Sequence, residues 1–382
     1  MGNPHAFLKE PKAIASVESL KRLDEAGYLY YMDCDWDYYD IPKEFMPIFD
    51  AGCSTFFAPN MEGDHVMYRN YDLAHYLHGD RTTEPTACGV VVRCFNPKAR
   101  FKSIGVADAF WLDRVNQGIG RGTPDDGVTD ISLFALVPYV CMDGINEAGV
   151  TVSIMALSVE SDWNEIGYEE GCKQFEDCKK RKFVLEKAGE VPSPKQEYAE
   201  IGSIAVNHTD KKAWKATKAL VEQKVEGKPS TSHTFLMRMI LDNCASVDEA
   251  VALTMKYNMK ALIRGSDYHV MICDATGKSV VIEWIGDETR VLETNISTNF
   301  RLSCEDGWEK DKRYGIIEAA FARFSGTLRE DYGVAMLELV KQDPKNGYDR
   351  SNTLTTSIYN TVKKTLRVFA MKDFTTPYDF TL

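Results

Sequence analysis

The sequence has no long hydrophobic run. Nothing in its 382 residues approaches the roughly 18 consecutive apolar residues that would suggest a membrane-spanning helix. The opening stretch, MGNPHAFLKEPKAIASVESLKRLDEAG, also lacks the apolar centre of a secretory signal peptide. We therefore expect a cytoplasmic protein with no membrane partner. Its ten cysteines should then be mostly reduced.

The chain has fewer basic residues than acidic ones. The chain has 45 Lys and Arg against 57 Asp and Glu, a net charge of −12. An acidic balance argues against a surface that binds nucleic acid or anionic lipid. We therefore expect a small-molecule partner and no nucleic acid.

Metal-ligand spacing is missing as well. Only Cys172 and Cys178, in GCKQFEDCKK, suggest a metal, and no second Cys or His pair lies near them. The better interpretation of this segment is a solvated helix face. We expect no metal and no cofactor.

What is present is a series of hairpins and helices in separate runs. Such runs favour an α+β fold over alternating βαβ units. Expected strands cover 28–33, 54–59, 65–72, 86–95 and 149–157, and expected hairpins cover 268–286 and 352–371. Expected helices cover most of 1–27 and then 233–244, 246–257, 311–324 and 331–342, with a capping box of Ser246 and Glu249 opening the third.

The stretch AGCSTFFAPNMEGDHVMYRNYD places Cys53 close to Arg69 and Asp72. A nucleophilic cysteine needs a base, and none of the seven histidines lies in a papain-type or caspase-type motif. A cut before Cys53 would supply one. The new α-amine would have a pKa near 7.7–8.0, roughly that of model compounds, and could accept the thiol proton. The preceding Ala51-Gly52 is small and flexible, as a strained scissile bond requires.

This stretch resembles the start of the choloylglycine hydrolase family. These N-terminal-nucleophile hydrolases cleave linear amides and include bile salt hydrolases and penicillin V acylases. The matching motifs are Cys53-Ser54, Gly63 at the hairpin turn and the run from Arg69 to Asp72. The resemblance continues along most of the chain after Cys53. DGINEAGVTVSIM, STNF and DKRYGII match later family motifs in the right order, and they contribute Asn146, Asn299 and Arg313.

The resemblance implies a four-layer αββα sandwich of the N-terminal-nucleophile hydrolase type. It implies that residues 1–52 are a propeptide, removed by the protein itself, and that 53–382 form the hydrolase domain. Within that domain, 160–230 is polar and irregular, as expected of an insertion or covering segment. By family analogy the assembly is a homo-oligomer, a tetramer.

The resemblance also assigns roles to six residues. Cys53 attacks the amide carbonyl and its own amine carries the proton. The Asn146 side chain binds the oxyanion. Asp72 orients the α-ammonium, while Arg69 and Arg313 hold Asp72 and favour the thiolate. Asn299 completes the polar shell of the site, and Asn295 is the alternative residue for that role.

Each of these residues has a plainer interpretation. Cys53 alone would be a buried core thiol. Arg69 and Asp72 alone would be a cross-strand ion pair. Asn146, before Glu-Ala-Gly, would be a turn residue.

Three functions remain open from the sequence. The first is a cysteine amidohydrolase acting on N-acyl compounds of the bile-salt, penicillin V or N-acyl amino acid type. The second is an acyltransferase on the same scaffold, in which an amine takes the acyl group. The third is an unprocessed binding protein whose residues 1–52 block the site.

Overall fold

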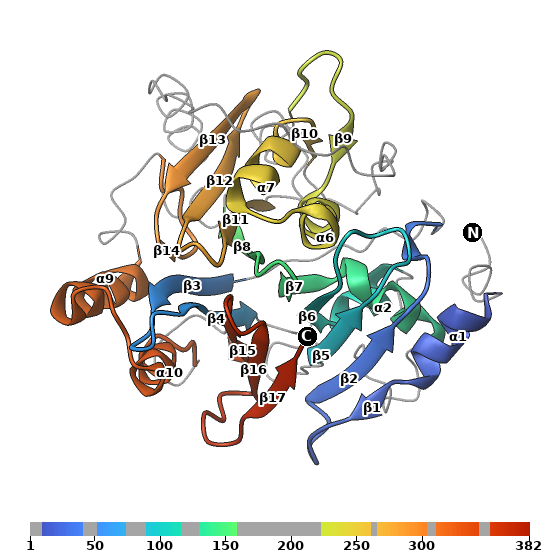
Figure 1. Cartoon of the computed structure of the whole chain (residues 1–382), viewed down its shortest axis with the longest axis horizontal. Helices are drawn as coiled ribbons and strands as arrows, with labels where there is room; N and C mark the ends of the chain where they lie inside the picture. The colour runs from blue at the N-terminus through green and yellow to red at the C-terminus, as the bar shows by residue number, and fades with distance from the viewer. Residues whose placement is uncertain are drawn as a thin grey trace, which may run out of the picture.

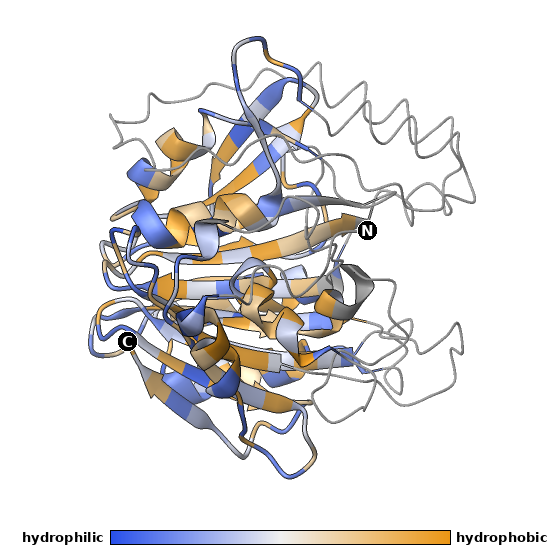
Figure 2. Ribbon diagram, turned by 90° about the vertical axis from the view of Figure 1, so that its right-hand side faces the viewer, coloured by the Kyte–Doolittle hydropathy of each residue, from blue (hydrophilic) through white to orange (hydrophobic). Residues whose placement is uncertain are grey.

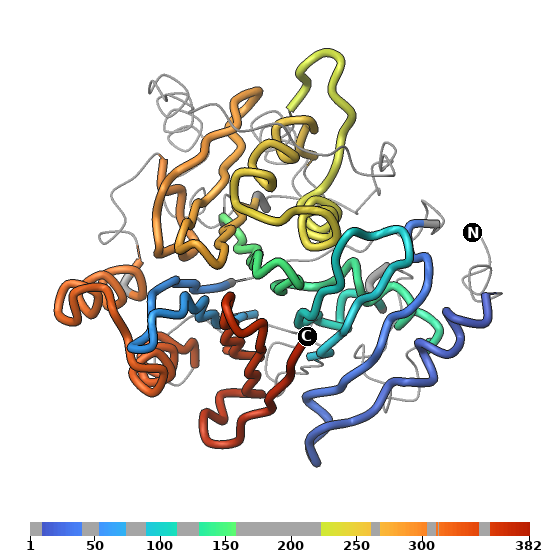
Figure 3. The backbone as a smooth tube through the Cα atoms, in the orientation of Figure 1, coloured from blue at the N-terminus to red at the C-terminus, as the bar shows by residue number. Residues whose placement is uncertain are grey.

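The structure is a computed structural model that describes residues 10–40, 52–73, 89–115, 130–158, 223–260, 266–303, 311–343 and 352–382. Most of the expected covering segment 160–230 lies outside these ranges, as do Cys172 and Cys178. Figure 3 traces the chain path from the N-terminus to the C-terminus.

The larger sheet has nine strands in the order β1-β2-β5-β6-β7-β8-β11-β12-β13 (Figure 1). All its neighbouring pairs are antiparallel except β2 with β5, which run parallel. The strands are β1 (Lys21–Arg22), β2 (Leu29–Cys34), β5 (Gly89–Cys94), β6 (Ser103–Asp108), β7 (Cys141–Asn146), β8 (Thr151–Ser158), β11 (Ser266–Cys273), β12 (Ser279–Ile285) and β13 (Glu288–Glu293).

The smaller sheet has six antiparallel strands in the order β14-β3-β4-β15-β16-β17. They are β14 (Ile296–Ser297), β3 (Gly52–Pro59), β4 (His65–Leu73), β15 (Asn352–Asn360), β16 (Thr365–Ala370) and β17 (Tyr378–Thr381). A separate parallel pair joins β9 (Ser230–Thr231) to β10 (Asn258–Met259).

The two sheets face each other and helices cover both outer faces. Between the sheets, β3 contacts β8 and β15 contacts β7. Helices α6 (His233–Asn243) and α7 (Val247–Thr254) pack on the nine-stranded sheet, and α9 (Lys312–Phe324) and α10 (Glu330–Leu339) on the six-stranded sheet. The predicted four-layer αββα sandwich is therefore confirmed. The remaining elements are α1 (Pro11–Glu18), η1 (Tyr38–Asp40), α2 (Phe110–Val115) and η2 (Ile131–Tyr139).

Hydrophobic residues, in orange, recur along the strands and helices (Figure 2). Beneath α9 the fully buried ring of Phe56 stacks on Tyr68, with centroids 4.8 Å apart, and meets Phe321 edge-on at 5.8 Å. Such aromatic packing fixes the outer face of β3 and β4 against the helix. The inner face of the same two strands is therefore left to meet the other sheet.

Residues 10–40 form one edge of the larger sheet, beside residues 89–94 (Figure 3). A helix over most of 1–27 was the wrong prediction for this segment within its described part. The helix ends at Glu18 and β1 follows, because the Asp24 carboxylate accepts bonds from the backbone N–H groups of Tyr28 and Leu29. Those bonds close a hairpin turn in which Gly27 takes a φ of 74°.

A buried polar cluster ties the end of this segment to α6. The Tyr39 hydroxyl donates to Asp242 at 2.7 Å and the Tyr38 hydroxyl to the same carboxylate at 3.0 Å. Asp242 also pairs with Arg238 at 2.6 Å, one turn earlier on the helix. A second contact joins β2 to β17, where the rings of Tyr31 and Phe380 stack with their centroids 5.6 Å apart. Residues 10–40 are therefore part of the folded body.

Tyr39→Phe should lower the free energy of unfolding by about 1–3 kcal/mol, because it deletes a buried hydrogen bond to a charged acceptor. Urea denaturation would measure this. Tyr332→Phe is the matched control: that residue is 42% exposed on α10, and its substitution should change stability by less than about 0.5 kcal/mol. Equal effects of both changes would contradict a stabilising role for the Tyr39 bond.

Candidate active site

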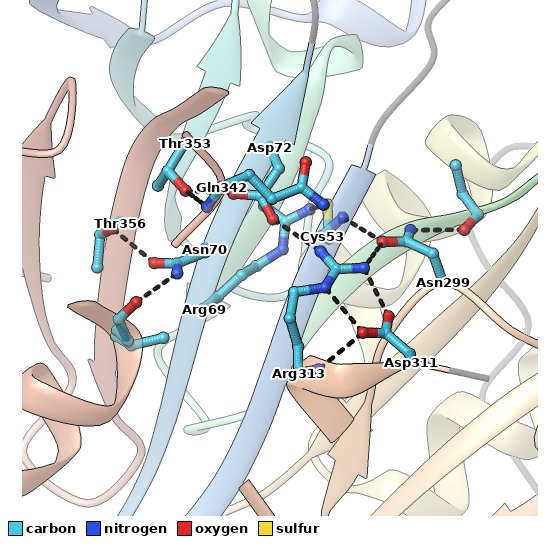
Figure 4. A network of polar contacts seen from close by, with 12 residues as sticks. Cys53, Arg69, Asn70, Asp72, Asn299, Asp311, Arg313, Gln342, Thr353 and Thr356 are labelled. Atoms are coloured by element: carbon cyan, nitrogen blue, oxygen red, sulfur yellow. Dashed lines mark hydrogen bonds and ion pairs between the residues drawn. The ribbon is translucent and has the colours of Figure 1, made fainter. Parts of the chain in front are cut away.

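Cys53 lies on β3, between β14 and β4, and faces the nine-stranded sheet (Figure 4). Its side chain is fully buried. Its backbone N–H donates to the side-chain oxygen of Asn299 at 2.8 Å. Its sulfur lies 2.8 Å from Arg69 Nη2, which donates to it, and 3.5 Å from the Ile154 carbonyl oxygen. Both the nitrogen and the sulfur of one cysteine are thus held by side chains of other strands and loops.

The thiol is neutral in this environment. Burial raises the pKa of Cys53 to about 12, and the nearby Arg69 guanidinium offsets only part of that rise. A thiolate at neutral pH would require that the site admit water, or that a new base form beside the sulfur.

Arg69 crosses from the smaller sheet to the larger one. Its guanidinium is fully buried, pairs with Asp143 on β7, and donates to Ser153 Oγ at 3.0 Å and to the Ile154 carbonyl at 2.6 Å on β8. The Tyr359 hydroxyl donates to the other oxygen of Asp143. All the charge of Arg69 is therefore balanced inside the sandwich, next to the Cys53 sulfur.

A second buried ion pair lies on the nitrogen side of Cys53. Arg313, at the start of α9, donates to Asp72 at 3.0 Å and to the Asn299 side-chain oxygen at 2.7 Å. Asp311 caps the same helix and also binds the Arg313 guanidinium. The Asn299 amide nitrogen donates to the Ala156 carbonyl at 2.6 Å. Asn299 therefore joins the Cys53 nitrogen, the Arg313 charge and strand β8 through one side chain.

The Asp72 carboxyl is fully buried and its pKa is about 6. Burial raises this pKa, while Arg313 and the hydroxyl of Thr353 limit the rise. Arg313 and Asn299 link this carboxyl to the Cys53 nitrogen, so it is suited to respond to a charge that appears there.

The structure brings together five of the six predicted site residues: Cys53, Arg69, Asp72, Asn299 and Arg313. Asn299, rather than Asn295, contacts Cys53; the Asn295 carbonyl instead accepts the backbone N–H of Phe57.

Asn146 is not brought to Cys53. Its amide nitrogen donates to the carbonyls of Leu241 and Cys244, and its oxygen accepts the N–H groups of Ala148 and Val150. Both hydrogens and both lone pairs of the amide are therefore used, and none is left for an oxyanion. The turn-residue interpretation describes Asn146, which closes the β7–β8 turn and holds the end of α6.

Four residues of the network went unnoticed in the sequence: Asp143, Asp311, Thr353 and Tyr359. A signal existed for Asp143, since CMDGIN places a carboxylate in the middle of a strand, between the apolar Met142 and Ile145. A buried carboxylate needs a cation, and Arg69 is that partner. Thr353 and Tyr359 are distant in sequence from the motif, and only the pairing of β15 with β4 brings them near.

The described ranges offer neither a metal site nor a membrane-spanning helix. Within them no group of three His, Cys, Asp or Glu could hold a metal ion. No helix there is long and apolar enough to cross a membrane.

Asp143→Asn should cost about 3–5 kcal/mol of unfolding free energy, because it leaves the Arg69 charge buried beside a neutral group. Asp379→Asn is the control: it breaks an exposed pair with Arg367 and should cost at most about 1 kcal/mol. Chemical denaturation of both variants measures the difference. A cost for Asp143→Asn no larger than for Asp379→Asn would show that Arg69 does not depend on Asp143.

Comparisons with known proteins find a family model and several solved structures that are similar to this chain. Residues 216–373 match the family model described as acyl-coenzyme A:6-aminopenicillanic acid acyl-transferase. A search of curated proteins finds no significant match. Among solved structures, a mutant of the conjugated bile acid hydrolase from Clostridium perfringens aligns at 14% identity and a TM-score of 0.48, over 86% of this chain and 92% of that one. The penicillin V acylase from Agrobacterium tumefaciens aligns at 12% identity and a TM-score of 0.41, over 86% of this chain and 85% of that one. The family match includes the Asn299 and Arg313 motifs but not Cys53, and it shows that residues 216–373 are similar to the penicillin acyltransferase family.

Proposed function

We propose that the chain is a cysteine amidohydrolase that cleaves the linear amide bond of N-acyl compounds after it has cut its own backbone before Cys53. The observation that carries this proposal is the double anchoring of Cys53. Its sulfur is held by Arg69 and its nitrogen by Asn299. A structural thiol needs neither contact, whereas a nucleophile that is also an N-terminus needs both.

The first step is the cut. The Cys53 sulfur attacks the Gly52 carbonyl carbon, the Gly52–Cys53 C–N bond breaks, and the nitrogen takes the thiol proton to become an amine. Water then hydrolyses the resulting thioester, which releases a chain ending at Gly52 and restores the thiol. Glycine offers the least steric resistance to this attack.

Turnover repeats the same chemistry on an external amide. The α-amine of Cys53 accepts the thiol proton as the sulfur attacks the acyl carbon, and passes it to the leaving amine. Water hydrolyses the acyl thioester to the free acid. In this proposal Asn299 and Asp72, which Arg313 bridges, would hold the α-ammonium and balance its charge; the bonds among Cys53, Asn299, Arg313 and Asp72 support these roles.

A second candidate is an acyltransferase, in which an amine replaces water in the last step. The family match over residues 216–373 favours this alternative, since that family is described by acyl transfer to 6-aminopenicillanic acid. A third is a blocked binding protein, favoured by the complete burial of Cys53. Product analysis with and without an added amine separates the first two.

A cut before Cys53 would not by itself free the upstream segment. Residues 10–40 are paired with β5 and bonded to Asp242 through Tyr38 and Tyr39. We expect the two chains to stay together without a covalent bond, so the segment 1–52 is better described as a retained chain than as a discarded propeptide.

Cys53→Ala should abolish both the cut and amide hydrolysis, with a loss of roughly 10³-fold or more, because no other thiol among the residues that the structure describes takes part in the network. Intact-mass measurement should find wild-type chains that begin at Cys53 and that co-elute with the 1–52 chain in gel filtration. The variant should remain one chain.

Cys273→Ala is the control, since Cys273 is a buried thiol on β11 outside the network. It should cut as the wild type does. An uncut wild type that hydrolyses penicillin V, a glycine-conjugated bile salt or an N-acyl amino acid at full rate would contradict the amine mechanism. An uncut and inert wild type would favour the blocked binding protein.

Asp72→Asn should lower kcat on the order of 10²-fold and change KM little, because its charge stabilises an ammonium that forms during the reaction. Steady-state kinetics on penicillin V, a glycine-conjugated bile salt or an N-acyl amino acid, whichever is hydrolysed, would measure the effects on kcat and KM separately. Asp64→Asn, on the β3–β4 hairpin, should leave both constants unchanged. A raised KM at constant kcat would instead assign Asp72 to binding.

A further inference from the structure

A fully buried histidine and glutamate lie behind Asn299, on the larger sheet. His269 is on β11 and Glu283 is on the adjacent antiparallel strand β12. Each directly neighbours, along its own strand, a member of the Val270–Ile282 pair. Both side chains have 0% exposure, and His269 Nδ1 lies 3.2 Å from the Glu283 carboxylate. Buried ionisable pairs are costly and persist where they bind something else in turn.

What they bind is the segment that carries Asn299. His269 Nε2 lies 2.8 Å from the Thr298 carbonyl oxygen, on the N-terminal side. Glu283 accepts the N–H of Leu302 at 2.8 Å and that of Ser303 at 3.1 Å, on the C-terminal side. The pair therefore holds the backbone on both sides of Asn299.

Ser297 lies 3.1 Å from His269 Nε2, so Ser297, His269 and Glu283 have the residue types of a hydrolytic triad. The hydrogen bonds exclude that role. The Thr298 carbonyl can only accept, so Nε2 carries its hydrogen and cannot take one from the Ser297 hydroxyl. A histidine that donates from this nitrogen is a fixed support.

Glu283 is held in its ionised form. Burial alone would raise the pKa of Glu283, but the hydrogen bond and charge of His269, together with the Ser303 bond, lower it overall. Glu283 is then a carboxylate, which accepts the two backbone N–H groups and lies beside His269 Nδ1.

We propose that His269, held by Glu283, is a positioning residue for Asn299: it fixes the Thr298 carbonyl and thereby aims the Asn299 side-chain oxygen at the Cys53 nitrogen. This inference rests on the proposed function of that nitrogen. The bond from Cys53 to Asn299 is 2.8 Å, and a displacement of about 1 Å at such a contact can cost 10²-fold in rate.

The test is a double-mutant cycle on the rate of self-cleavage, followed by intact mass over hours. His269→Phe keeps the ring volume and deletes both ring nitrogens, His269→Gln keeps an N–H donor, and each is made alone and with Asn299→Ala. We expect a loss of about 10- to 100-fold for His269→Phe and a smaller one for His269→Gln, both shrinking to less than about 2-fold when Asn299→Ala is present. Equal losses in both backgrounds, or no loss, would overturn the proposal.

The control is His233→Gln, at a buried histidine that packs on Tyr268 and Trp284. It should leave the cleavage rate within about 2-fold of wild type. If His269→Phe does not fold, Glu283→Gln takes its place in the cycle, with the same expected pattern.

A second measurement does not depend on activity. In the Cys53→Ala background the chain stays intact, and hydrogen exchange can be followed at the backbone N–H of position 53 and across residues 296–303. His269→Gln should speed exchange at both places and His233→Gln at neither. Unchanged exchange would overturn the positioning role, whereas a wild type that neither cuts itself nor hydrolyses amides would overturn the proposed function alone.

Discussion

The buried charge of Arg69 organises the centre of this molecule. It is carried by β4 of the smaller sheet, and it is neutralised by Asp143 on β7 of the larger one. A guanidinium cannot remain in such a place without a partner, so each sheet supplies half of one ion pair and the two inner faces must dock in one register. The same guanidinium donates to the Cys53 sulfur, so the docking of the sheets also determines the surroundings of the thiol.

The helix layer contributes a second, independent set of constraints. Arg313 projects from the first turn of α9 to Asp72 and Asn299, with Asp311 as both helix cap and ion partner. The aromatic packing of Phe56 and Phe321 sets the distance of that helix from β3. The α9 layer and both sheets thus meet around Cys53. This is why no single sequence motif contains the whole network.

Sequence reasoning identified most of the fold and the local part of the site. The hairpins and amphipathic helices have strong periodic patterns, and Cys53, Arg69 and Asp72 lie within one hairpin, so their proximity follows from chain geometry. Asn299 and Arg313 were found through family motifs. Asn146 was placed by the same kind of motif, yet its environment is set by the end of α6, which no local pattern encodes. Tyr359 and Thr353 depend on which strand neighbours β4, and the parallel pairing of β2 with β5 is a choice between distant segments.

That parallel pairing has a consequence for how the chain is made. The β5 strand carries Val90, Val91 and Val92, all fully buried, and β2 covers the hydrogen-bonding edge beside them. A polypeptide synthesised from Cys53 onward would present this apolar edge to solvent, and such an edge is a template for association with other chains. The upstream strand β2 therefore protects β5 from association with other chains, and a gene shortened to begin at Cys53 would encode a protein prone to aggregate.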